Sequence, residues 1–129
     1  KISDIVILNH EISGEMKEEV LLNADIFIQT SRFEGMPMGI LEALSYGVPC
    51  LVTEGTTLGE LINHYSAGWG VRTNVDAISI ALRDVIRNKS KWEKMSGNAI
   101  NLIKENFLWE NIVKNMMQKY ESIVNEKGN

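Results

Sequence analysis

Short apolar runs alternate with amphipathic segments over the first half of this chain. Four such runs stand at residues 5–8, 26–28, 50–52 and 69–71. Each is only a few residues long and is bounded by polar or turn-forming residues, which is typical of a strand buried on both faces. The segments between them carry apolar residues at helical spacing, and this alternation predicts parallel strands joined by helices. We therefore expect an α/β fold with a parallel sheet of about four strands flanked by helices.

Helix signals fill the spaces between these strands. Ser13 is placed to cap a first helix, and apolar stripes predict further helices over residues 40–44 and 58–62. After residue 75 the pattern is wholly helical. Asp76 is expected to cap one helix there, and Ser90 begins a Ser-x-x-Glu capping box that predicts the next. We therefore expect C-terminal helices to follow the sheet.

The last predicted helix is strongly amphipathic. It begins near Trp109, and its apolar stripe runs for about four turns, which requires a large partner surface. We interpret Trp92, Trp109 and the methionines of this helix as packing residues. Residues 76–129 carry nine Lys or Arg and seven Asp or Glu, whereas residues 1–75 carry four and ten. The basic tail is compatible with peripheral contact to an anionic membrane surface, although a solvated helix face has the same composition.

Composition narrows the class of protein. The 129 residues are 44% hydrophobic and 23% charged, as in a globular domain rather than a disordered chain. The net charge of −4 disfavours nucleic acid as a partner. Cys50 is the single cysteine beside two histidines, so no structural metal site is expected. We expect a cytoplasmic location, extending to the inner face of the membrane, with no signal peptide or membrane span.

The N-terminal end suggests a longer polypeptide. Lys1 leads almost directly into the apolar run at residues 5–8, without an initiator methionine. A buried strand that begins so abruptly is typical of a piece cut from a larger protein. We therefore expect part of the functional site to lie upstream of Lys1.

Polar and glycine-containing loops follow the expected strands. They cover residues 9–14, 30–38 and 53–58. The carboxyl ends of parallel strands meet at one edge of a sheet, and open α/β sheets bind their ligands beyond that edge. The chemistry of this chain is therefore expected in these three loops.

The second of these loops leads into a helix N-terminus, which attracts phosphate through its unpaired N–H groups and its partial positive charge. Gly35 and Gly39 let a ligand approach the backbone closely, and Pro37 pre-sets the first helical turn. Glu34 and Glu42 flank this point, and carboxylates accept hydrogen bonds from vicinal hydroxyls. A ligand with a central phosphate and hydroxyl-rich groups on both sides, such as a nucleoside diphosphate sugar, suits this arrangement.

Simpler interpretations of the same residues stay open at this point. Glu42 is compatible with an ordinary solvated helix position, and Glu34 with an ion pair to Arg32. Gly35 and Pro37 are also common turn residues. A glycosidase pair of carboxylates is a further alternative, although nothing in the chain predicts the open groove and aromatic platforms of such an enzyme.

The spacing of these residues resembles that of a known family. Glu34 is followed after seven residues by Glu42, then by Ala43 and by Gly-Val-Pro at residues 47–49. This pattern resembles the signature of retaining glycosyltransferases of family 4. Further matching stretches are residues 24–28, 107–110 and 31–39, the last in a form similar to bacterial capsule and exopolysaccharide enzymes.

The resemblance implies a GT-B fold of two Rossmann-like domains, with residues 1–129 as the C-terminal, nucleotide-sugar-binding domain. The parent enzyme would transfer a sugar from a nucleoside diphosphate sugar to a saccharide or lipid-linked acceptor, with retention of configuration. Neither a metal nor another cofactor is expected. The N-terminal acceptor domain and a basic pair for the diphosphate would lie upstream of Lys1, so the isolated chain is expected to be inactive.

The same resemblance assigns roles to single residues. Glu34 would act at the transferred sugar as the catalytic residue, and Glu42 would bind the ribose hydroxyls. The full donor-binding set that it implies is Glu42, Gly35, Met36, Met38, Gly39, Arg32, His10, Gly55 and Thr56. Pro37 departs from the glycine common in the family at that position, which removes one N–H donor.

Two other classes of function are compatible with this architecture. One is an enzyme with different chemistry, such as a nucleotide-sugar epimerase. A phosphorylase would need a lysine for its pyridoxal phosphate, and residues 18–88 contain none. The other is a non-catalytic nucleotide-binding or interaction module.

Overall fold

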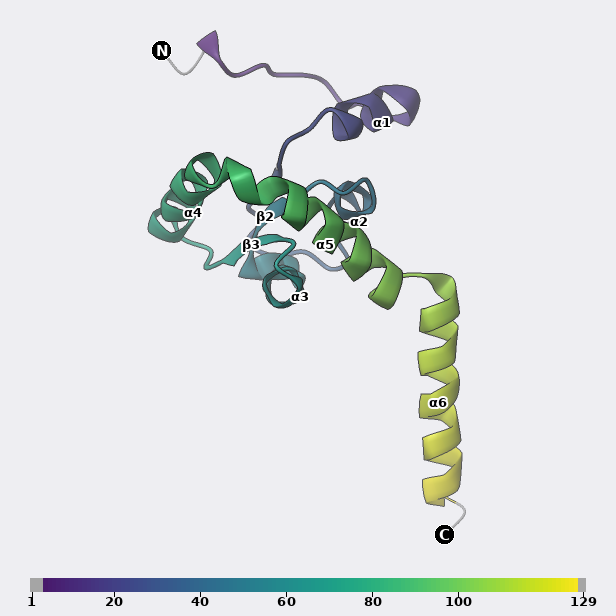
Figure 1. The fold of residues 1–129 in the computed structure, drawn as a ribbon. Coiled ribbons are helices and arrows are strands. Elements are labelled where there is room, and N and C mark those ends of the chain that lie inside the picture. The colour runs from purple at the N-terminus through teal and green to yellow at the C-terminus, as the bar shows by residue number, and fades with distance from the viewer. Residues whose placement is uncertain (1–3, 128–129) are drawn as a thin grey trace.

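A computed structural model describes residues 4–127 of the chain (Figure 1). Three parallel strands form one sheet in the order β1-β2-β3, with β1 at Phe27–Gln29, β2 at Cys50–Thr53 and β3 at Gly68–Val71. The helices are α1 (Gly14–Leu22), α2 (Met38–Ser45), α3 (Gly59–Tyr65), α4 (Val75–Arg87), α5 (Trp92–Asn106) and α6 (Trp109–Lys127), with short 3-10 turns η2 (Glu54–Thr56) and η3 (Lys89–Lys91). The expected α/β fold with a parallel sheet, flanking helices and C-terminal helices is confirmed.

The connections place three loops at one edge of the sheet. Helix α2 lies between β1 and β2 in the chain, and α3 between β2 and β3. Because all strands run in the same direction, the segments that follow β1, β2 and β3 leave the sheet on the same side. Two of the loops expected to carry the chemistry, 30–38 and 53–58, are among them.

The core lies between the sheet, α2, α3 and α5, and β2 is buried along its whole length. The fully buried large side chains of this core are Ile40, Leu44, Ile62, Leu102 and Val52. Gly47 lets α2 approach α5: it has φ +74°, and a Cβ there would lie 2.7 Å from Ser96 Oγ. A glycine is therefore needed where this helix ends.

The predicted first strand is wrong. Residues 5–8 form no strand, and their side chains are 49–92% exposed. Their β-branched composition favours a strand, but a strand also needs a partner edge, and β1 pairs only with β2 among the described residues. Within residues 4–127 the sheet therefore has three strands instead of about four, and the N-terminal end of the described chain lies away from it (Figure 1).

Helix starts also differ from the predicted ones in detail. Helix α4 begins after Asn74, whose side chain accepts a hydrogen bond from Ala77 N at 2.8 Å, so Asp76 is not its cap. Ser90 lies inside η3, and α5 follows that turn without a side-chain cap. Ser13 does occupy the N-cap position of α1, but its hydroxyl makes no capping hydrogen bond.

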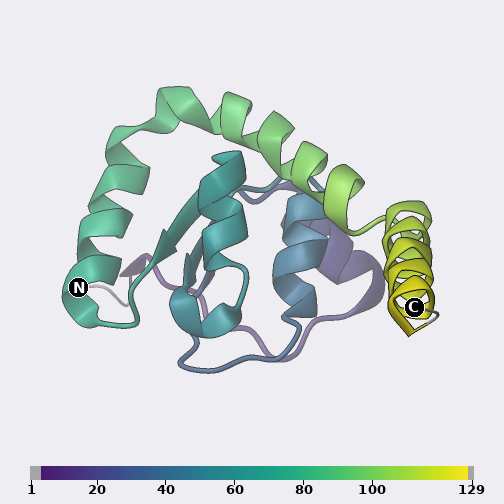
Figure 2. The same cartoon turned by 90° about the horizontal axis from the view of Figure 1, so that it is seen from below.

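Helix α6 begins at Trp109 as predicted, but its expected packing is wrong. The helix projects from the body of the molecule (Figures 1 and 2). Trp109 is 78% exposed, and Met116 and Met117 are also exposed. Trp92 is half-buried, with Lys89 Nζ 5.3 Å from its ring centroid. Amphipathic spacing shows that a helix has a face to cover, but the covering surface must come from elsewhere.

Candidate functional site

Glu34 stands in the loop after β1, and two neutral side chains hold its carboxylate. Gln29 Nε2 donates to Glu34 Oε1 at 3.0 Å, and Ser31 Oγ donates to the same oxygen at 2.8 Å. The alternative of an Arg32–Glu34 ion pair is wrong. The Arg32 side chain is exposed and makes no ion pair within residues 4–127.

Strand β2 and turn η2 fix the backbone of the loop that carries Glu34. Glu34 N donates to Gly55 O at 2.7 Å, and Thr53 Oγ1 donates to Ser31 O at 2.5 Å. A Cβ on Gly55 would lie only 2.3 Å from Arg32 O, so the two backbones can approach this closely only with glycine. Thr56 is fully buried, and its hydroxyl donates to Thr53 O at 2.7 Å, within the turn.

Glu42 lies one turn into α2 and is tied to α1. Lys17 Nζ lies 2.9 Å from Glu42 Oε1, and the two side chains are 43% and 37% exposed. Glu42 borders two pockets: an apolar one of about 320 Å³ beside β1 and a second of about 360 Å³ that reaches Tyr46. Glu42 is therefore a partly buried, paired carboxylate at the rim of open space rather than a freely solvated one.

The start of α2 between the two carboxylates has no side-chain cap. Pro37 is buried at the N-cap position, and its carbonyl accepts from Ile40 N and Leu41 N at 3.1 and 3.3 Å. The N–H groups of Met38 and Gly39 precede these bonds and belong to the unpaired first turn. A Cβ on Gly39 would lie 3.4 Å from Phe27 Cζ and 3.7 Å from Gln29 Oε1, so this turn packs directly on the end of β1.

Apolar side chains surround the loop on its solvent side. Phe33, Met36 and Met38 are 86%, 61% and 59% exposed. A Cβ added at Gly35 would meet no atom within 4 Å, and the Gly35 carbonyl accepts from Thr57 Oγ1 at 3.1 Å. The structure therefore gathers all but one of the expected site residues around the loops after β1 and β2 and the start of α2.

His10 is the exception. It is exposed and belongs to the segment between the predicted first strand, which does not form, and α1. Residues 5–8 do not enter the sheet, although Ile12 of the loop that follows them lines the pocket of about 320 Å³ together with Gly39 and Glu42. Within residues 4–127, His10 makes no hydrogen bond or ion pair with the other expected site residues.

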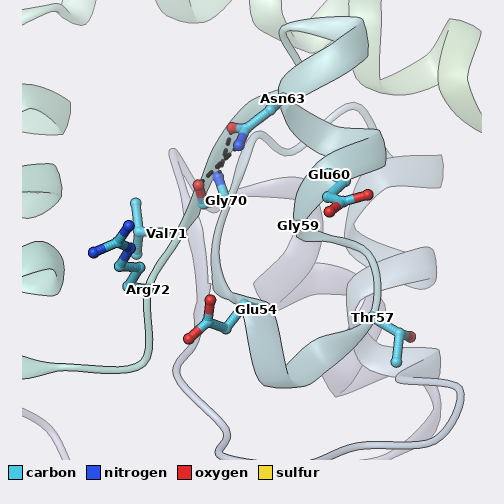
Figure 3. Close-up of a pocket in the computed structure, with 8 residues that line it drawn as sticks. All are labelled: Glu54, Thr57, Gly59, Glu60, Asn63, Gly70, Val71 and Arg72. Atoms are coloured by element: carbon cyan, nitrogen blue, oxygen red, sulfur yellow. Dashed lines mark hydrogen bonds between the residues drawn. The ribbon is translucent and has the colours of Figure 1, made fainter.

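A pocket of about 350 Å³ lies beside the site, where η2, α3 and β3 meet (Figure 3). Glu54, Glu60 and Arg72 give it charges of both signs. Asn63 shapes one wall through two hydrogen bonds of 2.8 Å, one to Gly70 O and one from Gly70 N. Sequence reasoning missed Asn63 and Arg72, although the position of Arg72 directly after the last expected strand was an available signal.

Neither a metal-binding cluster nor a membrane-spanning helix occurs among the described residues. Between residues 4 and 127, no three His, Cys, Asp or Glu side chains are grouped so that they could hold a metal ion. None of the helices in that range combines the length and the hydrophobicity needed to cross a bilayer.

Comparison with known proteins identifies the family. Residues 1–102 match the family described as "Glycosyl transferases group 1". The chain belongs to this family. As a group 1 glycosyltransferase, it is 24% identical over 115 residues to a sucrose synthase of Nitrosomonas europaea, covering 85% of this chain and 14% of that protein. An uncharacterized glycosyltransferase of Methanocaldococcus jannaschii is 26% identical over 118 residues, 91% of this chain and 30% of that protein.

The name of a third relative specifies its donor and acceptor. The chain is 36% identical over 96 residues to an Escherichia coli UDP-Gal:alpha-D-GlcNAc-diphosphoundecaprenol alpha-1,3-galactosyltransferase, covering 74% of this chain and 24% of that protein. Among solved structures, a sucrose-phosphate synthase from Thermosynechococcus elongatus matches the fold with a TM-score of 0.77 at 19% identity, over 97% of this chain and 32% of that one. This group 1 glycosyltransferase chain thus spans between 14% and 30% of the length of the curated relatives described here.

Proposed function

We propose that this chain is the donor-binding part of a longer, retaining glycosyltransferase of family 4. The enzyme transfers a sugar from a nucleoside diphosphate sugar to a saccharide or lipid-linked acceptor. The observation that carries the proposal is the uncapped start of α2, bracketed by the carboxylates of Glu34 and Glu42.

Each part of such a donor has a chemically matched place. The diphosphate suits the N–H groups of Met38 and Gly39, because a helix N-terminus carries a partial positive charge. Glu34, before the helix, is placed for the hydroxyls of the sugar. Glu42, one turn into the helix, is placed for the ribose diol, with Lys17 holding one of its two oxygens.

The same arrangement supports the chemical step. When the bond between sugar and diphosphate breaks, positive charge develops on the sugar ring and negative charge on the leaving group. The α2 N-terminus stabilises the leaving diphosphate, and the anionic Glu34 stabilises the ring. These groups are the chain's own, so the proposal needs neither a metal ion nor another cofactor.

The remaining partners follow from length and from exposed surface. The relatives are several times longer than this chain, so we assign the acceptor site to a further N-terminal domain. The uncovered apolar face of α6 suits contact with such a domain. The acceptor in the name of the Escherichia coli relative is a sugar linked through a diphosphate to a lipid. We extend the proposal to a role in bacterial capsule or other polysaccharide synthesis, in the cytoplasm at the inner face of the membrane.

Nucleotide binding is the first test. Amide NMR shifts of the chain are followed during titration with UDP, GDP and ADP. One nucleotide is expected to shift Gly35, Met38 and Gly39, and Glu42→Ala is expected to weaken this response. Glu15→Ala, an exposed glutamate on α1, is the matched control. Equal shifts in the wild type and Glu42→Ala would contradict the ribose role of Glu42.

Transfer is the second test and uses the full-length enzyme. Glu34→Ala is expected to abolish transfer while nucleotide binding is kept, and NMR of the product is expected to show retained anomeric configuration. A rate unaffected by Glu34→Ala would contradict the proposal and favour a non-catalytic module. An epimerised sugar recovered without transfer would show the alternative chemistry.

A further inference from the structure

We propose that Gln29 and Ser31 are positioning residues of this enzyme. They fix the Glu34 carboxylate through one oxygen and leave the other oxygen for the sugar. This inference rests on the proposed function and adds two residues that the expected site did not contain.

Both hydrogen bonds to the Glu34 carboxylate go to the same oxygen. Gln29 Nε2 and Ser31 Oγ both donate to Glu34 Oε1, at 3.0 and 2.8 Å. Within residues 4–127, Oε2 receives no hydrogen bond. Two donors on one oxygen fix the plane and the direction of the carboxylate, because rotation about the terminal torsion would break both bonds. The second oxygen is then held in place with its hydrogen-bonding capacity unused.

Both donors are fixed by elements other than the loop itself. Gln29 is the last residue of β1, in register with Val52 of the buried strand β2. Its amide lies against Gly39, where a side chain would meet Gln29 Oε1 at 3.7 Å. Ser31 is held through its carbonyl, which accepts from Thr53 Oγ1 at 2.5 Å. The orientation of Glu34 is therefore set by the sheet and not by the exposed part of the loop.

The two hydrogen-bond donors to Glu34 are both uncharged, and this matters as much as their position. An amide and a hydroxyl are neutral, so they orient the carboxylate without cancelling its charge. An arginine at the same place would pair with that charge, and the Arg32 side chain is instead exposed. The full negative charge of Glu34 stays available to the sugar ring at the moment when positive charge develops there.

Removing the hydrogen-bonding group of Gln29 or of Ser31 tests the proposal in the full-length enzyme. The variants are Gln29→Met, which keeps the length of the side chain, and Ser31→Ala, with Ser31→Thr as the rescue variant. Gln118→Met and Ser122→Ala are matched controls on the polar, exposed side of α6. The assay measures kcat and donor KM with UDP-galactose, UDP-glucose, GDP-glucose and ADP-glucose as candidate donors.

We expect kcat to fall about ten- to hundredfold in Gln29→Met and in Ser31→Ala, as is typical when a charged group loses a hydrogen bond. The KM for the nucleotide sugar is expected to stay within about twofold, because Gln29 and Ser31 touch Glu34 and not the nucleotide. Ser31→Thr is expected to restore most of the rate.

The results distinguish a failure of the positioning role from a failure of the proposed function. If Glu34→Ala abolishes transfer but neither Gln29→Met nor Ser31→Ala changes kcat more than about twofold, the positioning role is overturned and the proposed function stands. The positioning role is likewise overturned if the two variants raise KM instead of lowering kcat, or if Ser31→Thr does not restore the rate that Ser31→Ala loses. If no candidate donor is used, or if Glu34→Ala leaves transfer intact, the proposed function and the positioning role fall together. If Gln29→Met does not fold, Ser31→Ala alone tests the positioning role.

Discussion

Replacing Gly55 with alanine should displace the backbone of the loop that carries Glu34. The added Cβ would lie 2.3 Å from Arg32 O, 2.5 Å from Arg32 C and 2.7 Å from Ser31 O. Ordinary van der Waals contact begins near 3.4 Å, so the loop backbone must retreat by about 1 Å. Overpacking of this kind costs about 1–3 kcal/mol. The reduced entropy of the unfolded chain returns about 0.4–1 kcal/mol, so a net loss of about 1–2 kcal/mol in the free energy of unfolding is expected.

The effect on activity should exceed the effect on stability. Glu34 N donates to Gly55 O at 2.7 Å, so a shift of the two backbones against each other moves the carboxylate as well. A misplacement of about 1 Å at a reacting group costs on the order of 100-fold in rate. We therefore expect Gly55→Ala to lower kcat by about two orders of magnitude while most of the protein remains folded.

Urea unfolding and the transfer assay check both numbers, with Gly97→Ala as the matched control. Gly97 lies exposed inside α5, and a Cβ there meets no atom within 4 Å. Alanine at that site should raise the free energy of unfolding by about 0.5–1 kcal/mol and leave the rate unchanged. If Gly55→Ala proved as stable and as active as the wild type, the close approach of η2 to the loop would not constrain Glu34, and the reasoning would be refuted.

Three further predictions concern single contacts. Lys17→Met should weaken nucleotide binding less than about fivefold by calorimetric titration, because the half-exposed ion pair with Glu42 is worth about 0.2–1 kcal/mol. Gly70→Ala should lower the melting temperature more than Gly55→Ala does, since its Cβ would lie 2.1 Å from Gly59 O in the packed joint of α3 and β3. Burial raises the pKa of the Cys50 thiol from 9.0 to about 12. The contribution of this thiol to stability is therefore full below pH 9 and falls as the pH rises toward 12. Between pH 7 and pH 10 the wild type should lose more stability in urea unfolding than Cys50→Ala does.

Much of the candidate site follows from local sequence. Glu34, the start of α2 and Glu42 belong to one continuous segment, so their order along a loop and a helix is fixed by spacing alone. What touches the two carboxylates depends on tertiary contacts. Glu34 is bound by Gln29 and Ser31, where a sequence-adjacent arginine was the obvious candidate, and Glu42 pairs with a lysine 25 residues away. Such contacts depend on how β1, α1 and α2 pack, which no short-range pattern encodes.

The α/β class, the strands of the sheet after residue 25 and the loops at its carboxyl edge can all be predicted from the sequence alone. Apolar periodicity encodes these features locally, because it marks which face of each segment must leave water. Whether each apolar face finds a partner depends on the tertiary structure. Residues 5–8 have the composition of a buried strand and α6 has the stripe of a packed helix, yet both are exposed. A pattern specifies a surface to bury, whereas burial requires a second surface that another part of a polypeptide must supply.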